Sequence, residues 1–112
     1  MSVVEQYARA HIVTDEEDPG AVPVLLRYDP DSDPRTVLVD LPGAHEWAFS
    51  RALLERGLRA PAESGAVRVW PCGRVQAVVE FHSDNGVEVV QFDSKALLSF
   101  LRRTYTAEPV HS

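Results

Sequence analysis

The sequence predicts an α+β protein in which a strand-rich unit ends in a helix twice, with about seven strands and two helices in one domain over residues 1–112. Two observations carry this prediction. The stretch SRALL (Ser50–Leu54) returns as SKALL (Ser94–Leu98), 44 positions later. Each copy follows short runs rich in Val and Leu that turn-forming residues separate, which is the pattern of strands. An internal duplication explains the recurrence, and chance repetition of a common strand-to-helix junction is the alternative.

The first half contains several extended segments before its helix. They are separated by loops of turn-forming residues, an acidic one at Asp15–Gly20 and a second at Asp29–Pro34. Pro23 lies near the start of a predicted strand, where its missing N–H does least harm. The predicted strands and extended segments are Val3–Val13, Val22–Tyr28, Thr36–Leu41 and His45–Phe49.

A short helix follows, and its ends are marked in the sequence. Ser50 suits the N-cap, because its hydroxyl can accept a backbone N–H of the first turn. Phe49 and Leu54 have the spacing of a hydrophobic staple across that cap. Gly57 predicts the left-handed residue that ends the helix.

The second half repeats this order. Ala66–Trp70 predicts a strand that Pro71 ends. Asn85-Gly86 predicts a tight hairpin turn, and Val87–Phe92 the returning strand. The strand before that turn, Val75–His82, has the clearest alternation in the chain. Its predicted apolar face comprises Val75, Ala77, Val79 and Phe81.

The second helix begins at Asp93 or Ser94, either of which can cap it. Cations near the C-terminal end, Arg102 and Arg103, interact favourably with the helix dipole. The predicted apolar stripe comprises Leu97, Leu98, Leu101 and Tyr105, joined by Phe100.

Charge and composition bound the class of protein. The net charge is −6, which argues against general binding to nucleic-acid phosphates, since that needs a surplus of Lys and Arg. No apolar run reaches the roughly 20 residues of a membrane span, and the first residues carry no secretory signal pattern. A single cysteine, Cys72, excludes an internal disulfide and fits a reducing compartment. We therefore expect a cytoplasmic protein without a membrane span.

The patterns that bind metals or carry catalysis are incomplete in this sequence. Four aspartates follow the spacing of an EF-hand calcium loop, but Pro34 occupies the position that needs glycine. A turn-rich acidic loop is therefore the better interpretation of Asp29, Asp31, Asp33 and Asp40. The histidines are scattered, and the sequence has neither a nucleophile elbow nor a glycine-rich phosphate loop. We expect no catalytic, cofactor-binding or metal-binding residues, and hence no enzyme.

Five short motifs follow one another along the chain in a distinctive order. An RYD element (Arg27–Asp29) precedes DPxxV (Asp33–Val37), then WxFxRxLLxxGL (Trp47–Leu58), GxVRxWP (Gly65–Pro71) and FLxRT (Phe100–Thr104). No single motif is specific, but together they cover most of the sequence. In order and spacing the chain resembles the SsgA-like proteins of actinomycetes, a family of sporulation-specific cell division proteins.

This resemblance implies a fold similar to that of the Whirly-type nucleic-acid-binding proteins, assembled as a homotrimer. It also implies a role without catalysis, because SsgA-like proteins promote septum formation by acting on FtsZ directly or through one another. We therefore expect a cytoplasmic adaptor that is recruited to the septum, with FtsZ or other SsgA-like proteins as partners. Single-stranded nucleic-acid binding is the alternative function, suggested only by the Whirly-type fold, and the acidic balance argues against it.

The side chains expected to make assembly or partner contacts are Arg27, Trp47, Phe49, Arg51 and Trp70. The alternative for the aromatic residues is a purely structural role in the core, which is the favoured interpretation of both tryptophans. Base stacking is less favoured, because few basic residues surround these aromatic side chains.

Overall fold

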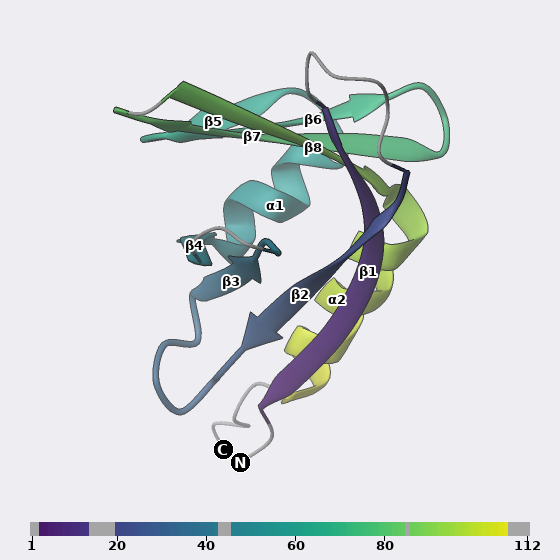
Figure 1. The fold of residues 1–112 in the computed structure, drawn as a ribbon. Coiled ribbons are helices and arrows are strands. Elements are labelled where there is room, and N and C mark those ends of the chain that lie inside the picture. Colours follow the sequence, from purple (N-terminus) through teal and green to yellow (C-terminus); the bar gives the residue numbers. More distant parts are fainter. Residues whose placement is uncertain (1–2, 14–19, 43–45, 85, 108–112) are drawn as a thin grey trace.

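The computed structural model describes residues 3–13, 20–42, 46–84 and 86–107, which form one antiparallel sheet and two helices (Figure 1). The strands are β1 (Val4–Val13), β2 (Val22–Tyr28), β3 (Thr36–Asp40), β4 (Glu46–Ser50), β5 (Ala62–Ser64), β6 (Val67–Cys72), β7 (Gln76–Ser83) and β8 (Gly86–Asp93). The helices are α1 (Arg51–Gly57) and α2 (Ser94–Ala107).

Two consecutive groups of four strands, each followed by a helix, make up the sheet. Its strand order is β4-β3-β2-β1-β8-β7-β6-β5, so that each group is an antiparallel meander and the two meet at β1 and β8. This arrangement confirms the predicted α+β class with two helices. The described residues form eight strands, whereas the sequence predicted about seven.

The strand that the sequence did not predict is β5. It has three residues, too few for an alternating pattern, and it forms a tight hairpin in which Ser64 pairs with Val67. Gly65 lies between them with φ of +59°, a conformation that glycine adopts without steric cost. The formation of β5 therefore depends on its pairing with β6 and on the turn at Gly65, not on a pattern within its own three residues.

Strand β1 joins the two meanders. Its residues Val4–Ala10 pair with β2, and Ala10–Val13 pair with β8. Ala10 thus lies opposite Val22 on one side and Phe92 on the other. Four residue pairs between β1 and β8 connect the halves into a continuous sheet.

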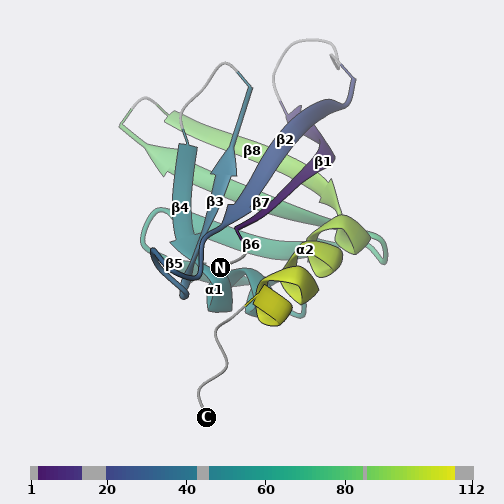
Figure 2. The same cartoon turned by 90° about the horizontal axis from the view of Figure 1, so that it is seen from below.

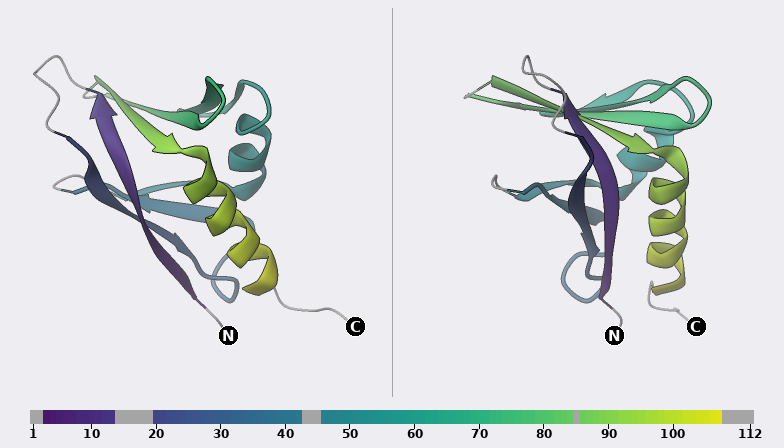
Figure 3. Two further views of the ribbon diagram at one scale, coloured as in Figure 1. Left: turned by 90° about the vertical axis from the view of Figure 1, so that its right-hand side faces the viewer. Right: turned by 45° about the vertical axis from the view of Figure 1, so that its right-hand side comes forward.

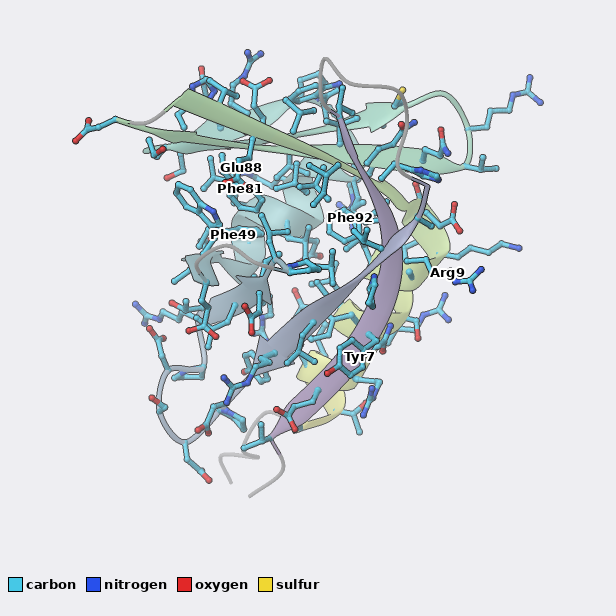
Figure 4. The ribbon with its side chains drawn as sticks, in the orientation of Figure 1. Tyr7, Arg9, Phe49, Phe81, Glu88 and Phe92 are labelled. Carbon is cyan, nitrogen blue, oxygen red and sulfur yellow. The ribbon has the colours of Figure 1, made fainter. Side chains whose placement is uncertain are left out.

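The sheet is strongly curved, and the two meanders lie across from each other with the core between them (Figure 3). Trp47 on β4 stacks on Phe81 of β7 with ring centroids 4.9 Å apart. Phe49 lies 5.9 Å from the same ring. Figure 4 shows Phe49, Phe81 and Phe92 pointing into the space between the two halves.

The predicted apolar face of the strand before the hairpin is largely confirmed. Ala77, Val79 and Phe81 of β7 are all buried. Val75 is 66% exposed, contrary to the prediction, because it lies in the turn before the strand begins. The turn at Asn85-Gly86 is confirmed in part: Ser83 pairs with Gly86, and Asn85 lies outside the described residues.

Pro71 does not end its strand, contrary to the prediction. Strand β6 continues to Cys72, and Pro71 pairs with Ala77 of β7. The neighbour on the other side, β5, pairs only with Val67–Val69. Pro71 therefore occupies an edge position, where a missing N–H is tolerated.

The N-terminal end of α1 is as predicted, and its C-terminal end is not. The Ser50 hydroxyl accepts the Leu53 N–H at 3.0 Å, which confirms the N-cap. Gly57, however, is the last helical residue and does not have a positive φ. A Cβ added at this position would lie 2.2 Å from the Val69 Cβ on β6. Glycine is needed here for close packing of the helix on the sheet.

Helix α2 covers the inner face of the sheet beside β1 and β8. Its predicted stripe is confirmed for Leu97, Phe100 and Leu101, which are buried together with Thr104. Leu98 and Tyr105 are 43% and 44% exposed, so their place in the buried stripe was predicted wrongly. A helix that packs on one face of a sheet buries one stripe, and these two side chains lie on its flank.

Replacing Gly57 with Ala is expected to lower the free energy of unfolding by about 1–3 kcal/mol, because the new methyl group collides with Val69. Urea denaturation measures the change, and Arg56→Ala, at an exposed position of the same helix, is the control. Helix propensity alone would make Gly57→Ala more stable by up to about 1 kcal/mol. An unchanged or increased stability would therefore contradict the steric explanation.

Candidate partner-binding surfaces

The five residues predicted to make partner contacts do not form one patch. Arg27 and Trp70 belong to the outer face of the sheet, which carries the residues that alternate with the core positions. Trp47 and Phe49 belong to the inner face. Arg51 begins α1. The structure thus distributes them among three environments.

Arg27 links β2 to β1 and to β4 on the outer face. Its Nε lies 3.2 Å from the Glu5 carboxylate on β1, and its Nη1 lies 3.3 Å from Glu46 on β4. The arginine side chain is 39% exposed, so solvent screens both ion pairs, and such pairs contribute about 0–1 kcal/mol each. Arg27 remains accessible to a partner.

The inner aromatic residues are part of the core. Phe49 is 8% exposed, and Trp47 is partly buried against the core cluster. Both contact Phe81, which is fully buried. These contacts connect the edge strand β4 to β7 across the core. A direct partner contact for either residue remains a prediction.

Arg51 connects three elements. Its Nη1 donates a hydrogen bond to the Tyr28 hydroxyl on β2 at 3.2 Å. Its guanidinium carbon lies 4.1 Å from the centroid of the Tyr105 ring on α2, a cation–π geometry. Tyr28 in turn donates to the Pro34 carbonyl at 2.9 Å, and Tyr105 donates to Glu55. Arg51 therefore holds α1, α2 and β2 together.

Trp70 lies on the outer face of the sheet, which also carries exposed apolar side chains on β1 and β8. Its ring is partly buried, and the Arg68 guanidinium carbon lies 5.5 Å from the ring centroid. Strand pairing places Trp70, Val78, Gln91 and His11 in one row across β6, β7, β8 and β1. Tyr7 is 71% exposed, Val13 55% and Val87 53%, and Tyr7 projects from β1 in Figure 4. We call Tyr7, Val13, Trp70 and Val87 the outer apolar face.

The acidic loop between β2 and β3 uses two of its carboxylates to fix the backbone. Asp29 Oδ1 accepts the Asp31 N–H at 3.0 Å. Asp33 accepts the Arg35 N–H at 3.0 Å and the Thr36 hydroxyl at 2.7 Å. The Thr36 bond above all lowers the pKa of the Asp33 carboxyl, because it stabilises the charged form. Within the described ranges, no three His, Cys, Asp or Glu side chains form a group suited to a metal ion.

The sequence analysis missed a hollow between the two helices, which lie side by side in Figure 2. It has a volume of about 230 Å³, and Leu58 and Arg59 after α1 meet Leu98, Arg102 and Tyr105 of α2 there. The available signal was charge, since α2 contains three basic residues and no acidic one. That imbalance is visible in the sequence, but the apposition of the helices is not.

The fold defines a class: an α+β protein with a curved eight-stranded sheet, two flanking helices and exposed surfaces on both the sheet and the helices. The family model described as Streptomyces sporulation and cell division protein, SsgA, matches residues 22–112. The chain belongs to this family of sporulation and cell division proteins, as the sequence motifs predicted.

Relatives and solved structures support the same assignment. The sporulation-specific cell division protein SsgB of Frankia casuarinae is 38% identical over 104 residues, covering 82% of this chain and 71% of the relative. SsgB of Streptomyces coelicolor is 38% identical over 105 residues, covering 88% and 76%. These relatives support a role in division or sporulation.

Two solved structures have similar folds. One comes from work in which mutations in SsgB correlate to longitudinal cell division during sporulation of S. coelicolor. It matches with a TM-score of 0.83 and 35% identity, over 95% of this chain and 86% of that one. An SsgA-like sporulation-specific cell division protein from Thermobifida fusca matches with a TM-score of 0.76 over 97% and 84%, and at 24% identity it supports the fold alone. Neither helix in the described part of the chain is long and apolar enough to cross a membrane.

Replacing Arg51 with Met is expected to lower the free energy of unfolding by about 1–2 kcal/mol, because the Tyr28 hydrogen bond and the Tyr105 cation–π contact are both lost. Arg59→Met is the matched control, since the Arg59 side chain is 80% exposed and makes one surface ion pair. Urea denaturation monitored by circular dichroism measures both. Equal effects of the two substitutions would show that Arg51 does not hold the helices together.

Proposed function

We propose that this protein is a non-enzymatic adaptor of sporulation-linked cell division. It recruits FtsZ or promotes its assembly at septum sites, directly or through other SsgA-like proteins, and is itself recruited from the cytoplasm to the septum. The observation that carries the proposal is membership of the SsgA family, with SsgB relatives 38% identical over most of the chain. A Whirly-like homotrimer is part of the same proposal.

The surfaces of the chain support an adaptor. An adaptor needs at least two accessible surfaces, so that one can hold the assembly while another binds a partner. The outer apolar face exposes Tyr7 and Val13 of β1 and Val87 of β8. Large exposed apolar side chains on one face favour protein–protein contact. We assign this face, including Trp70, and Arg27 on β2 to contacts between copies of the chain.

Light scattering tests the trimer and its interface. The wild-type protein is expected at three times the 12.4 kDa chain mass. Val13→Asp is expected to give monomers, because it places a carboxylate in the outer apolar face. Val75→Asp is the matched control: Val75 is 66% exposed against 55% for Val13, but it lies in a turn away from that face. A monomeric wild type, or equal masses for the two variants, would count against the assignment.

Co-sedimentation with FtsZ polymers tests the adaptor role. We expect the wild-type chain to pellet with FtsZ in the presence of GTP and to increase the amount of polymer, since a multivalent binder raises the local concentration of its partner. Bovine serum albumin at the same concentration is the control for trapping in the pellet. If the chain stays in the supernatant, both alone and mixed with an SsgB relative, recruitment of FtsZ is rejected.

A further inference from the structure

The two helices carry a positive charge that the chain as a whole does not. Six of the eleven basic residues lie on α1, on α2 or two positions after α1, and the same segments contain one acidic residue, Glu55. The rest of the chain is left with five basic and sixteen acidic residues. The six basic residues are Arg51, Arg56, Arg59, Lys95, Arg102 and Arg103. Positive charge is therefore concentrated in the helical segments of the sequence.

The hollow between the helices lies within this positive region. Its apolar wall includes Leu98 and Tyr105, large side chains that are 43% and 44% exposed. Its volume of about 230 Å³ suits one or two apolar side chains, and is below the roughly 300–1,000 Å³ of ordinary small-molecule sites. We call this hollow, with Leu58, Arg59, Leu98, Arg102 and Tyr105, the helix groove.

The charges beside the groove favour an anionic ligand. Arg59 and Arg102 both line it, and both are exposed. The one carboxylate in its lining, Glu55, accepts the Tyr105 hydroxyl and lies 3.7 Å from Arg59. Glu55 therefore offsets only part of the positive charge, and Arg102 is left to attract an incoming anion.

The walls of the groove are held in place before a ligand arrives. The Arg51 guanidinium lies 4.1 Å from the Tyr105 ring, so the two helices are coupled at one end of the hollow. Leu101 and Leu97 anchor α2 in the core. A preformed site costs less ordering free energy on binding than one that the ligand must assemble.

We propose that the helix groove binds an acidic peptide segment of a partner protein. One or two apolar side chains of the segment enter the hollow, and flanking Asp or Glu carboxylates contact Arg59 and Arg102. This inference rests on the proposed adaptor function and specifies the chemistry of one partner contact. Guanidinium groups suit carboxylates, because their planar N–H donors match the two carboxylate oxygens.

A peptide fits these observations better than a nucleic acid. A nucleic-acid strand would extend from the groove over the remainder of the chain, whose net charge is strongly negative and would repel phosphates. Single-strand binding also uses rows of aromatic stacking platforms. One face of the Tyr105 ring already lies against Arg51, and its hydroxyl donates to Glu55. An apolar hollow with two flanking cations instead matches an apolar anchor between acids.

The test measures fluorescence anisotropy of a fluorescein-labelled peptide, DEDLFEDE, against the full chain at low salt. The variant Arg59→Glu/Arg102→Glu is expected to bind at least tenfold more weakly than wild type. The matched control is Arg9→Glu/Arg74→Glu, which makes the same change in net charge at exposed positions that do not line the groove and is expected to bind at least threefold more tightly than the groove variant. If the charge-reversed protein does not fold by circular dichroism, Arg59→Gln/Arg102→Gln replaces it.

A second pair of probes tests the apolar part of the site. The peptide DEDSSEDE keeps the charges without the anchors, and Leu98→Asp places a carboxylate at the mouth of the hollow. Each is expected to weaken binding at least fivefold. If both peptides bind with equal affinity, charge alone explains the binding and the inference is overturned. Failure of wild type to bind DEDLFEDE would also overturn it.

The remaining outcomes separate this inference from its rivals. If wild type binds labelled oligothymidylate more tightly than the peptide, and the groove variant loses oligothymidylate binding, the groove is assigned to nucleic acid. Loss of self-association in the groove variant, without peptide binding by wild type, would assign it to a second copy of the chain. Both results overturn the inference. If wild type pellets with FtsZ but does not bind the peptide, the groove inference fails and the adaptor function stands. If wild type itself does not pellet, the adaptor function fails whatever the peptide result.

Discussion

The architecture depends on the short ladder between β1 and β8. Ala10–Val13 of β1 pair with Val89–Phe92 of β8, and these four pairs are the hydrogen-bonded connection between two meanders of the described chain. Because the sheet curves, this connection brings inner faces that are distant in sequence into one core. The stacking of Trp47 on Phe81 follows from it, since β4 and β7 belong to different meanders. Ala10, at the junction, is only 1% exposed, so the junction itself belongs to the core.

The two sides of the sheet carry different surfaces. Both helices lie on the side of the sheet that carries the core, so the basic residues of α1 and α2 gather on that side. The outer face keeps the apolar side chains that alternate with core positions on β1 and β8, including Tyr7 and Val87. A chain with one basic helical surface and one apolar sheet surface can assemble through one and bind a partner through the other. This division is the physical basis of the proposed adaptor role.

Local signals predicted the elements well wherever the decisive contact is close in sequence. The Ser50 cap contacts Leu53 three residues away, and the alternation of Ala77, Val79 and Phe81 follows from strand geometry alone. Several errors concern residues whose role depends on a distant neighbour. Gly57 is small because of Val69 on another element. The candidate contact residues show the same division: motif spacing singled out Arg51, but only the folded chain places it against Tyr105.

The sequence by itself determined the family, the α+β class, the two-part order of strands and helix, and the acidic overall charge, because each depends on residue types and their spacing along the chain. Only the tertiary structure decided that Leu98 and Tyr105 stay exposed on α2, that β6 runs through Pro71, and that five cations of a chain with net charge −6 lie on two neighbouring helices. These features arise from packing between segments far apart in sequence. Periodicity within one segment carries no information about which surface a distant segment will cover.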